Sequence, residues 1–319
     1  MSDGAGAPVP DGSSFTGRPD GAPLIPDGLD ATVVLLRHGE TEWIREGRFQ
    51  GASETPLSAL GRRQAALAGE RLARPHVPPA MPIPGGLPRE IVHSPLGRAA
   101  ETARAVADAI ADLRATETVD AAGHPVEPVA AGWEASASAL EAPLAPVVRP
   151  EPGIGEIRQG EWEGVTTEDI QRRWPDAIAG WRRDPSAVHA PGGESLAQVD
   201  ARVRPALARI LDELGRGYPR GTTDRPQVHG YRGVGAQSDQ PWSVLVGHDG
   251  VFKIVMLALF GLPLAKFWSF SLGLTGISVV EIRGGRPVLR AHNWTGHLAP
   301  IEDELALEAA EIRARSGAL

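Results

Sequence analysis

Two histidines follow two apolar segments that lie far apart in this chain. The run 32–36 is followed by Arg37 and His38, and the run 242–246 ends close to His248. A neutral histidine can attack phosphorus, and an arginine binds the anionic oxygens around it. Because the tips of parallel strands line the ligand crevice of α/β proteins, these residues form a candidate phosphate site. A single Arg-His pair often just terminates a strand, but two buried strands that both end at histidines favour a site.

A second arginine is expected beside these strand tips. Residues 90–93 have the pattern of a short strand, and a helix over 95–113 is expected with Ser94 as its N-cap and proline in its first turn. Arg98 then lies in the first turn, where the helix N-terminus and a guanidinium together attract an anion. Alone, Arg98 is typical of a solvated helix surface. Beside Arg37 it becomes a candidate phosphate ligand.

A proton donor can come from an acidic loop at 151–163. A carboxyl group held beside an aromatic side chain such as Trp162 can have a raised pKa and act as a general acid. Spacing does not select among the candidates, and the loop by itself is equally typical of a solvated acidic surface. The four candidates are Glu151, Glu156, Glu161 and Glu163.

Composition limits the classes of function. The 319 residues are 42% hydrophobic, which is enough for one large domain or two. A formal charge of −8 argues against general binding of nucleic acid or acidic membranes, so an anion site must be local. The lack of cysteine excludes disulfides and thiolate sites. No secretory signal or membrane-spanning stretch is recognisable, which predicts a cytoplasmic protein.

The expected strands and helices alternate, as an α/β fold requires. Helices are expected from the Ser58 cap to about residue 72, from Thr166 or Thr167 to a stop at Pro175, from a Ser195 capping box to about residue 214, and over 251–260. Pro205 predicts a kink or a division of the third of these. Strands are expected at 32–36, 90–93, 147–149, 242–246, 277–282 and 288–292, the last two joined by a glycine turn.

Several segments lack the periodicity of core elements. Residues 1–30 are rich in Gly, Pro, Ser and Asp, and we expect a disordered tail there. One domain is expected over 31–300, followed by a charged, helical tail at 301–319. The insertions of the domain are expected to be surface segments near 75–88, 115–146 and 215–240.

The motifs, taken in order, resemble the histidine phosphatase, or phosphoglycerate mutase-like, superfamily. The resemblance runs from about residue 32 to 297 through LRHGETEW, HSPLGRAAETA, GEIRQGEWEG, PGGESL and VLVGHDGV. It implies a three-layer α/β/α sandwich with a mixed, mostly parallel sheet. It also implies hydrolysis of a small phosphomonoester through a phosphohistidine, with neither metal nor cofactor.

Motif position implies the role of each site residue. His38 corresponds to the nucleophile, His248 to the second histidine, and Arg37 and Arg98 to the phosphate-binding arginines. The resemblance also selects Glu156 as the proton donor, a choice that spacing leaves open.

The predicted phosphate-binding set further includes Gly39, Gly51 and Asp249. Asp249 stands where glycine is frequent in the family, so its carboxylate should point away from the phosphate and leave only its backbone N–H. Ile44 replaces a common asparagine, which would donate a hydrogen bond to phosphate.

Three alternatives to a phosphatase differ in chemistry. A mutase is favoured by the segment 180–184, which resembles the family's double arginine, whereas PGGESL favours the phosphatase branch. A metallophosphatase would use His38, His248, Asp249 and Glu156 as ligands, but neighbouring arginines oppose a cation. A phosphate-binding protein without activity is supported by Ile44 alone. A sugar phosphate, a phosphoglycerate derivative or a nucleotide-like metabolite would fit, and a homodimer is left open.

Overall fold

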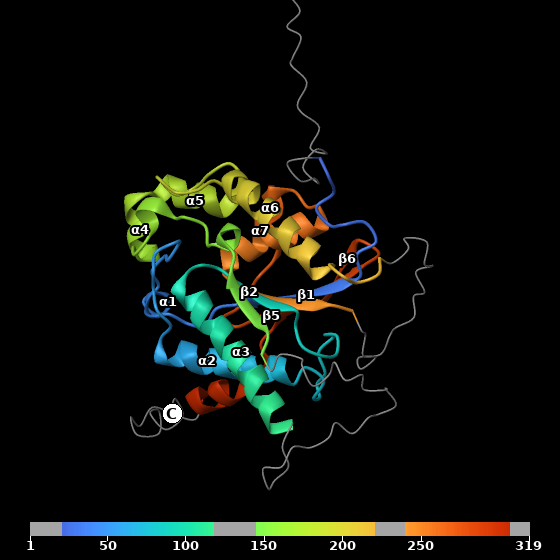
Figure 1. Ribbon diagram of the computed structural model, residues 1–319. Helices are drawn as coiled ribbons and strands as arrows, with labels where there is room; N and C mark the ends of the chain where they lie inside the picture. The colour runs from blue at the N-terminus through green and yellow to red at the C-terminus, as the bar shows by residue number, and fades with distance from the viewer. Residues whose placement is uncertain (1–20, 118–144, 221–239, 307–319) are drawn as a thin grey trace, which may run out of the picture.

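A mixed sheet of six strands lies between two layers of helices (Figure 1). The computed structural model describes residues 21–117, 145–220 and 240–306. The strand order is β3-β2-β4-β1-β5-β6; the first four strands are parallel, and β5 is antiparallel to its two neighbours, β1 and β6. This confirms the expected mixed, mostly parallel α/β fold. The strands are β1 (Ala31–Arg37), β2 (Glu90–His93), β3 (Val147–Pro150), β4 (Trp242–Gly247), β5 (Ile277–Arg283) and β6 (Arg286–Trp294).

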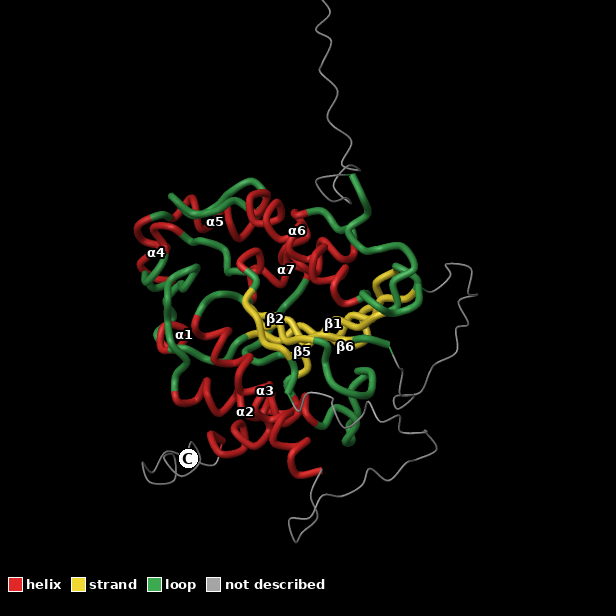
Figure 2. The backbone as a smooth tube through the Cα atoms, in the orientation of Figure 1, coloured by secondary structure: helices red, strands yellow, loops and turns green. Residues whose placement is uncertain are grey.

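Helices cover both faces of the sheet, as the tube in Figure 2 also shows. One layer holds α4 to α7, and the other holds α2 and α3 (Figure 1). Short 3₁₀ helices and α1 connect these elements along the loops. The helices are α1 (Glu42–Arg45), α2 (Ala59–Ala73), α3 (Gly97–Glu117), α4 (Thr167–Arg173), α5 (Pro175–Arg183), α6 (Leu196–Leu214) and α7 (Asp249–Phe260), with 3₁₀ helices η2 (Pro152–Ile154), η3 (Gly160–Trp162), η4 (Leu264–Ser269) and η5 (Gly296–Leu298).

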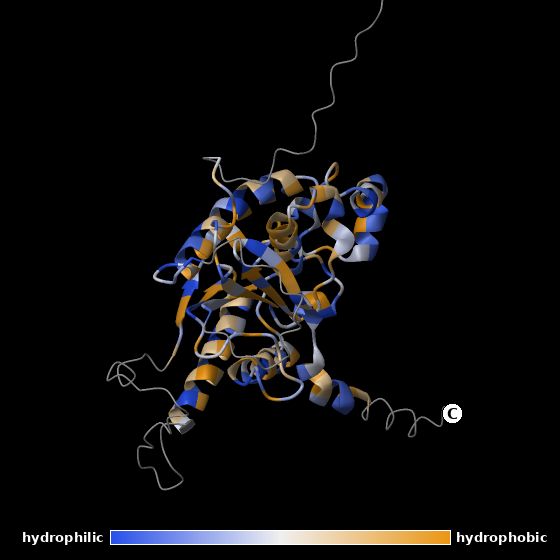
Figure 3. Cartoon of the chain, turned by 90° about the vertical axis from the view of Figure 1, so that its right-hand side faces the viewer, coloured by the Kyte–Doolittle hydropathy of each residue, from blue (hydrophilic) through white to orange (hydrophobic). Residues whose placement is uncertain are grey.

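β1 separates two hydrophobic cores because successive side chains of a strand point to opposite faces. Val33 and Leu35 pack in the core that includes α6 and α7, whereas Val34 and Leu36 pack in the core that includes α2 and α3. Figure 3 shows the hydrophobic residues concentrated on the central strands. A strand buried on both faces reads as a continuous apolar run, which is why its sequence predicts it well.

Two prolines, Pro205 and Pro175, were expected to interrupt helices, with different outcomes. The expected division of α6 at Pro205 is wrong: it is one helix, because its Ser195 capping box forms and its apolar face is buried along its length. These interactions offset the cost of an interior proline, about 3 kcal/mol. α4 ends at Arg173 with Trp174 as its C-cap, as expected, and Pro175 occupies the first turn of the next helix, α5, where a missing N–H costs nothing.

Some segments that we expected to be peripheral join the core. Leu24 and Leu29 are buried, so the expectation of a disordered tail is wrong for residues 21–30. Met81 and Ile83 are also buried, so the 75–88 insertion is anchored rather than fully exposed. Apolar side chains spaced between prolines suffice for this anchoring, although they give no periodic signal.

The other expected insertions fall largely outside the described residues. α3 continues to Glu117 before the chain leaves the described part, and 118–144, 221–239, 1–20 and 307–319 are not described. The expected C-terminal helix is present over 299–306. Across the described ranges, none of the helices has the length and apolar character needed to cross a membrane.

Candidate active site

The two predicted histidines meet at adjacent strand tips. β1 and β4 are parallel neighbours in which Arg37 pairs with Gly247, so His38 and His248 leave the sheet side by side. The His38 backbone N–H donates to the Gly247 carbonyl at 2.9 Å. The imidazole centroids are 5.0 Å apart with an interplanar angle of 62°, and both rings are almost completely buried.

His38 is fixed in one tautomer. Its Nδ1 lies 2.6 Å from the Gly39 carbonyl oxygen. Because a carbonyl oxygen only accepts, Nδ1 carries the hydrogen and Nε2 carries the lone pair. Burial, followed by the nearby charges of Arg98 and Arg37, holds the pKa of His38 well below its usual value. The ring is therefore neutral at neutral pH, with the Nε2 lone pair unprotonated.

Gly39 allows the chain to pass against the start of α2. A Cβ at this position would lie 2.3 Å from the Gly61 carbonyl oxygen, which is far inside van der Waals contact. The Gly39 N–H donates to the Thr102 hydroxyl at 3.3 Å. In this structure Gly39 thus fixes the backbone beside His38 through α2 and α3.

His248 is held by a residue that the sequence predicts to be a helix cap. Its Nε2 lies 2.7 Å from the Ser94 hydroxyl, whereas its Nδ1 is buried with no partner in the described part of the chain. Ser94 was expected to cap the helix at 95–113, but α3 begins at Gly97. Burial, then the charge of Arg98, keeps the pKa of His248 well below its usual value, so this ring is also neutral.

Arg98 is a fully buried cation that joins α3 to the loop after α1. Its guanidinium donates to the carbonyl oxygens of Ser53 and Gly51, each at 2.8 Å, and to the Thr55 hydroxyl at 3.3 Å, while Nε is unpaired within the described ranges. Burial lowers the pKa of Arg98 to about 10, and the carboxylate of Glu156 opposes that shift. Arg98 therefore stays charged at neutral pH.

Gly51 contributes to this arrangement through its carbonyl. Its φ of +53° lies in the left-handed region, and a Cβ there would be 2.3 Å from a carboxylate oxygen of Glu163. Glu163 accepts hydrogen bonds from the N–H groups of Ala52 and Gln159 at 3.1 and 2.9 Å. Glycine and glutamate together shape the loop that holds Arg98.

Arg37 lies at the end of β1 with part of its guanidinium free. One Nη donates to the Leu272 carbonyl at 2.6 Å, and its Nε has no partner within the described ranges. It is close enough to both histidines to lower their pKa values. Two cations therefore face a pair of neutral imidazoles.

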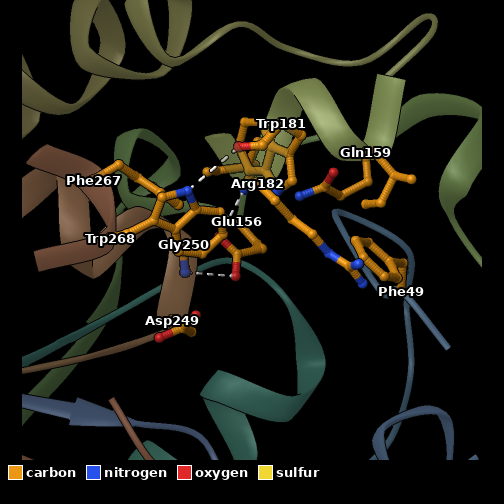
Figure 4. Close-up of a pocket in the computed structure, with 11 residues that line it drawn as sticks. Phe49, Glu156, Gln159, Trp181, Arg182, Asp249, Gly250, Phe267 and Trp268 are labelled. Carbon is orange, nitrogen blue, oxygen red and sulfur yellow. Dashed lines mark hydrogen bonds between the residues drawn. The ribbon is translucent and has the colours of Figure 1, made fainter. Parts of the chain in front are cut away.

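Glu156 is the acidic-loop residue that reaches this centre. One carboxylate oxygen accepts from the N–H groups of Ile157 and Val251, both at 2.9 Å, and the other accepts from Gly250 at 3.2 Å (Figure 4). Burial raises the pKa of Glu156 and the charge of Asp249 adds to this, although the backbone hydrogen bonds favour the ionised form. A protonated carboxyl group at higher pH than usual is the property a general acid needs.

The other three glutamates of the loop serve structure or face solvent. Glu151 forms ion pairs with Arg149 and Arg209, and Glu163 shapes the loop around Gly51. Glu161 is exposed. Position at the α7 N-terminus, where the N–H groups of Gly250 and Val251 bind its carboxylate, thus distinguishes Glu156, and this position is not visible in the spacing of the motif.

Arg202, which the sequence analysis missed, supports the loop that carries Glu156. From α6 its guanidinium donates to the carbonyl oxygens of Gly153, Gly155 and Glu156 at 2.8 to 3.0 Å. It also binds both carboxylate oxygens of Glu194 at 3.0 Å. The sequence held a partial signal, because Glu194 belongs to the PGGESL motif just before α6.

Comparison with known proteins identifies the architecture of this centre. A family model described as the histidine phosphatase superfamily (branch 1) matches residues 33–121, 134–217 and 232–295. The chain belongs to the histidine phosphatase superfamily. This confirms the resemblance on which the expected motif roles depend.

Several phosphatases of this superfamily are similar over most of the chain. Phosphoserine phosphatase 1 of Hydrogenobacter thermophilus is 28% identical over 266 residues, which cover 83% of this chain and 93% of that protein. Glucosyl-3-phosphoglycerate phosphatase of Mycobacterium tuberculosis is 31% identical over 253 residues, covering 79% and 85%. The solved structure of a mycobacterial glucosyl-3-phosphoglycerate phosphatase with VO3 matches with a TM-score of 0.59 and 26% identity, covering 83% and 100%.

Asp249 departs from the expected family pattern and is neutralised locally. Its carboxylate binds the ammonium group of Lys253 at 2.6 Å. Lys253 is itself almost buried and lies over the rings of Phe267 and Trp268, 5.2 and 4.9 Å from their centroids. Ile44, the other departure, lies on α1, where its N–H donates to the Thr41 side chain.

A cavity of about 280 Å³ opens beside the reaction centre of this histidine phosphatase fold. Glu156, Asp249 and Gly250 line its inner end (Figure 4). Most of the remaining wall is apolar, with two polar side chains. The residues that characterise it are Phe49, Trp181, Phe267, Trp268, Gln159 and Arg182.

A metal site in this centre has no structural support. Within the described ranges no three His, Cys, Asp or Glu side chains are grouped as metal ligands. Asp249, one of the ligands of the metal alternative, is paired with Lys253. The charges of Arg37 and Arg98, which act on both histidines, would oppose a cation there.

Proposed function

We propose that this protein is a phosphomonoesterase that works through a phosphohistidine on His38, without metal, on a small phosphorylated metabolite. The supporting observation is the tautomer of His38. Its Nδ1 hydrogen is held by the Gly39 carbonyl, so the Nε2 lone pair is available in a ring that burial keeps neutral. The names of the similar phosphatases support phosphate ester hydrolysis.

In the first step Nε2 of His38 attacks phosphorus and the bond to the leaving oxygen breaks. Arg37 and Arg98 neutralise the phosphate oxygens, and the unpaired Nδ1 of His248 can donate one more hydrogen bond if it carries the hydrogen. Glu156 gives its proton to the leaving alcohol. The products are the free alcohol and phospho-His38, with Glu156 ionised.

In the second step the ionised Glu156 takes a proton from water, and the resulting nucleophile attacks the phosphorus of phospho-His38. The P–N bond breaks and its electron pair returns to Nε2. Inorganic phosphate leaves, and Glu156 is again protonated. The raised pKa of Glu156 suits this cycle, because the same group must act as an acid and then as a base near neutral pH.

The experiment is phosphate release from a panel of phosphomonoesters, with a chelator present throughout. We expect turnover by the wild type and none by His38→Ala. His189→Ala is the matched control, because His189 also places Nδ1 beside the following carbonyl but lies outside the site. Turnover that disappears with the chelator, or that persists in His38→Ala, would overturn the proposal.

The mutase alternative has one observation in its favour. Arg182, from the segment that resembles the family's double arginine, lines the cavity beside Glu156. A mutase must protect its phosphohistidine from water and pass the phosphoryl group to a second alcohol. Release of inorganic phosphate that is unaffected by added acceptor alcohols would support the phosphatase, and transfer in preference to release would support the mutase.

A further inference from the structure

The cavity beside Glu156 occupies the place where the alcohol part of a substrate must lie. The proposed donor, Glu156, has to reach the leaving oxygen, which is the atom that joins phosphorus to the alcohol. Glu156 also lines the inner end of the cavity, together with Asp249 and Gly250 (Figure 4). The alcohol therefore projects from the phosphate site into this cavity.

The wall of the cavity is an ordered aromatic cluster. Trp181 and Phe267 are nearly buried, and their ring centroids are 5.5 Å apart. Trp268 packs against both, at 5.7 Å from Trp181 and 4.8 Å from Phe267, in edge-on geometry. Two rings held by the core thus fix the third at the rim.

Trp268 keeps an accessible surface although it is held in place. Its side chain is 46% exposed, while its Nε1 donates to the Trp181 carbonyl at 3.4 Å and Lys253 lies over its ring. An exposed tryptophan costs the protein favourable burial. Its place in the cavity wall, beside the leaving-group end of the site, allows it to contact the alcohol part of a substrate.

The opposite part of the cavity is polar. Figure 4 shows Gln159 and the guanidinium of Arg182 beside Phe49, across from Trp268. A ligand that fits must have a flat apolar face for the indole and polar groups along its edge. The volume, about 280 Å³, is near the low end of small-molecule sites, which begin at about 300 Å³.

From this combination we propose that the cavity selects phosphomonoesters whose alcohol carries one hydroxylated ring, and that Trp268 determines this selectivity by stacking on the ring face. This inference rests on the proposed phosphatase activity and adds the substrate class. A cyclic sugar presents C–H groups on its face and hydroxyls at its edge, so it matches both walls. A short open-chain alcohol would leave the indole uncovered.

The test compares two substrates that differ only in the ring. Glucose 6-phosphate and glucitol 6-phosphate are both primary alkyl esters with six carbons, so their intrinsic reactivity is similar. We expect kcat/KM of the wild type to be about tenfold higher for the cyclic ester, the size of effect that stacking on one aromatic ring can give. Trp268→Ala should remove most of this preference, and Trp268→Phe should keep part of it.

Tyr218→Ala is the matched control for Trp268→Ala. Tyr218 is 43% exposed and has the cation of Arg89 over its ring, as Trp268 has that of Lys253, but it does not line the cavity. It should leave the ratio of the two kcat/KM values unchanged.

The outcomes separate the inference from the proposed function. Turnover that depends on His38 but is equal for the two esters, or a ratio that Trp268→Ala leaves unchanged, would overturn the ring-binding inference alone. Lack of turnover of every ester, or turnover that persists in His38→Ala, would overturn the proposed function and the inference with it.

Discussion

The reaction centre and the neighbouring cavity are built in different ways. The centre lies at the tips of β1 and β4, where neighbouring strands hold His38 and His248 with their rings 5.0 Å apart. The cavity lies among α5, η4 and the loop at Phe49, where an exposed indole rests on a cluster anchored in the core. His38, His248 and Arg98 are buried and each is held by at least one hydrogen bond, so replacing one is expensive, whereas the cavity rim can change at little cost to folding.

Because of this difference, we expect the centre to determine the rate of the reaction and the rim to determine which alcohol is accepted. In the proposed reaction a buried cation or imidazole acts on the phosphate that all substrates share. An exposed side chain at the rim meets only the part that distinguishes one alcohol from another. Variants of the centre should therefore change kcat for every ester, and variants of the rim should change the ranking of esters.

The largest effect is expected from Arg98→Met. The loss of a charge beside the phosphate should lower kcat by about 10²- to 10³-fold. The carbonyls of Ser53 and Gly51 would also lose their donor, at a cost of about 1–3 kcal/mol for each unsatisfied group. Activity assays and thermal unfolding measure the two effects.

Arg209→Met is the control, because Arg209 is an exposed arginine that pairs with Glu151 on the other side of the loop. It should leave kcat near that of the wild type and lower the melting temperature little. If the two variants behaved alike, a special role for the buried guanidinium would be ruled out.

The next effect is expected from Glu156→Ala, and it should depend on the leaving group. Alkyl phosphates need a proton on the departing oxygen, so their kcat should fall by about 10²-fold, the lower end of the range for general acid catalysis. Nitrophenyl phosphate has a good leaving group and should be affected much less in the first step. An equal loss of kcat on both types of ester would show that Glu156 is not the proton donor.

A smaller effect with the same signature is expected from Arg202→Met. Arg202 touches the loop through three carbonyls, so its removal should misplace Glu156 without removing it. We expect a loss of about tenfold in kcat, greater for alkyl than for nitrophenyl esters, as for other changes that displace a catalytic group. A uniform loss on both ester types, or one seen only in stability, would indicate a purely structural role.

The smallest effect is expected from Asp249→Asn, as a shift of the pH profile. Asp249 raises the pKa of Glu156 while Arg98 lowers it, so loss of this negative charge should lower that pKa. Glu156 must be protonated to act as an acid, and the basic limb of kcat for alkyl esters should therefore move to lower pH. The double variant Asp249→Asn, Lys253→Met controls for the lysine left without its partner. A limb that stays in place, or moves upward, contradicts this account.

Each of these predictions addresses the contrast between a common centre and a selective rim. If Trp268→Ala lowered kcat for all esters to the same extent, the cavity rim would not determine which esters are preferred. If Arg98→Met changed the ranking of esters but not the rate, the centre would not act equally on all esters.

The amino-acid sequence by itself determined the sheet and the residues at its tips. Val33 to Leu36 form an apolar run that stays apolar because both faces of β1 are buried, and local spacing places Arg37 and His38 directly after it. Caps such as Ser58 and Ser195 also act within a few residues, so they could be read from the chain. The motifs, in order, then led to the family.

Only the tertiary structure decided which polar groups meet across long distances in the chain. It brings Ser94 to His248 and Arg202 to the Glu156 loop, and it places Glu156 at the α7 N-terminus while Glu161 faces solvent. It also buries Leu24 and continues α6 through Pro205, against the local signals. The physical reason is the same in each case. The free energy of each arrangement comes from burial and from hydrogen bonds between segments that are distant in the chain, and the local spacing of residues does not predict such contacts.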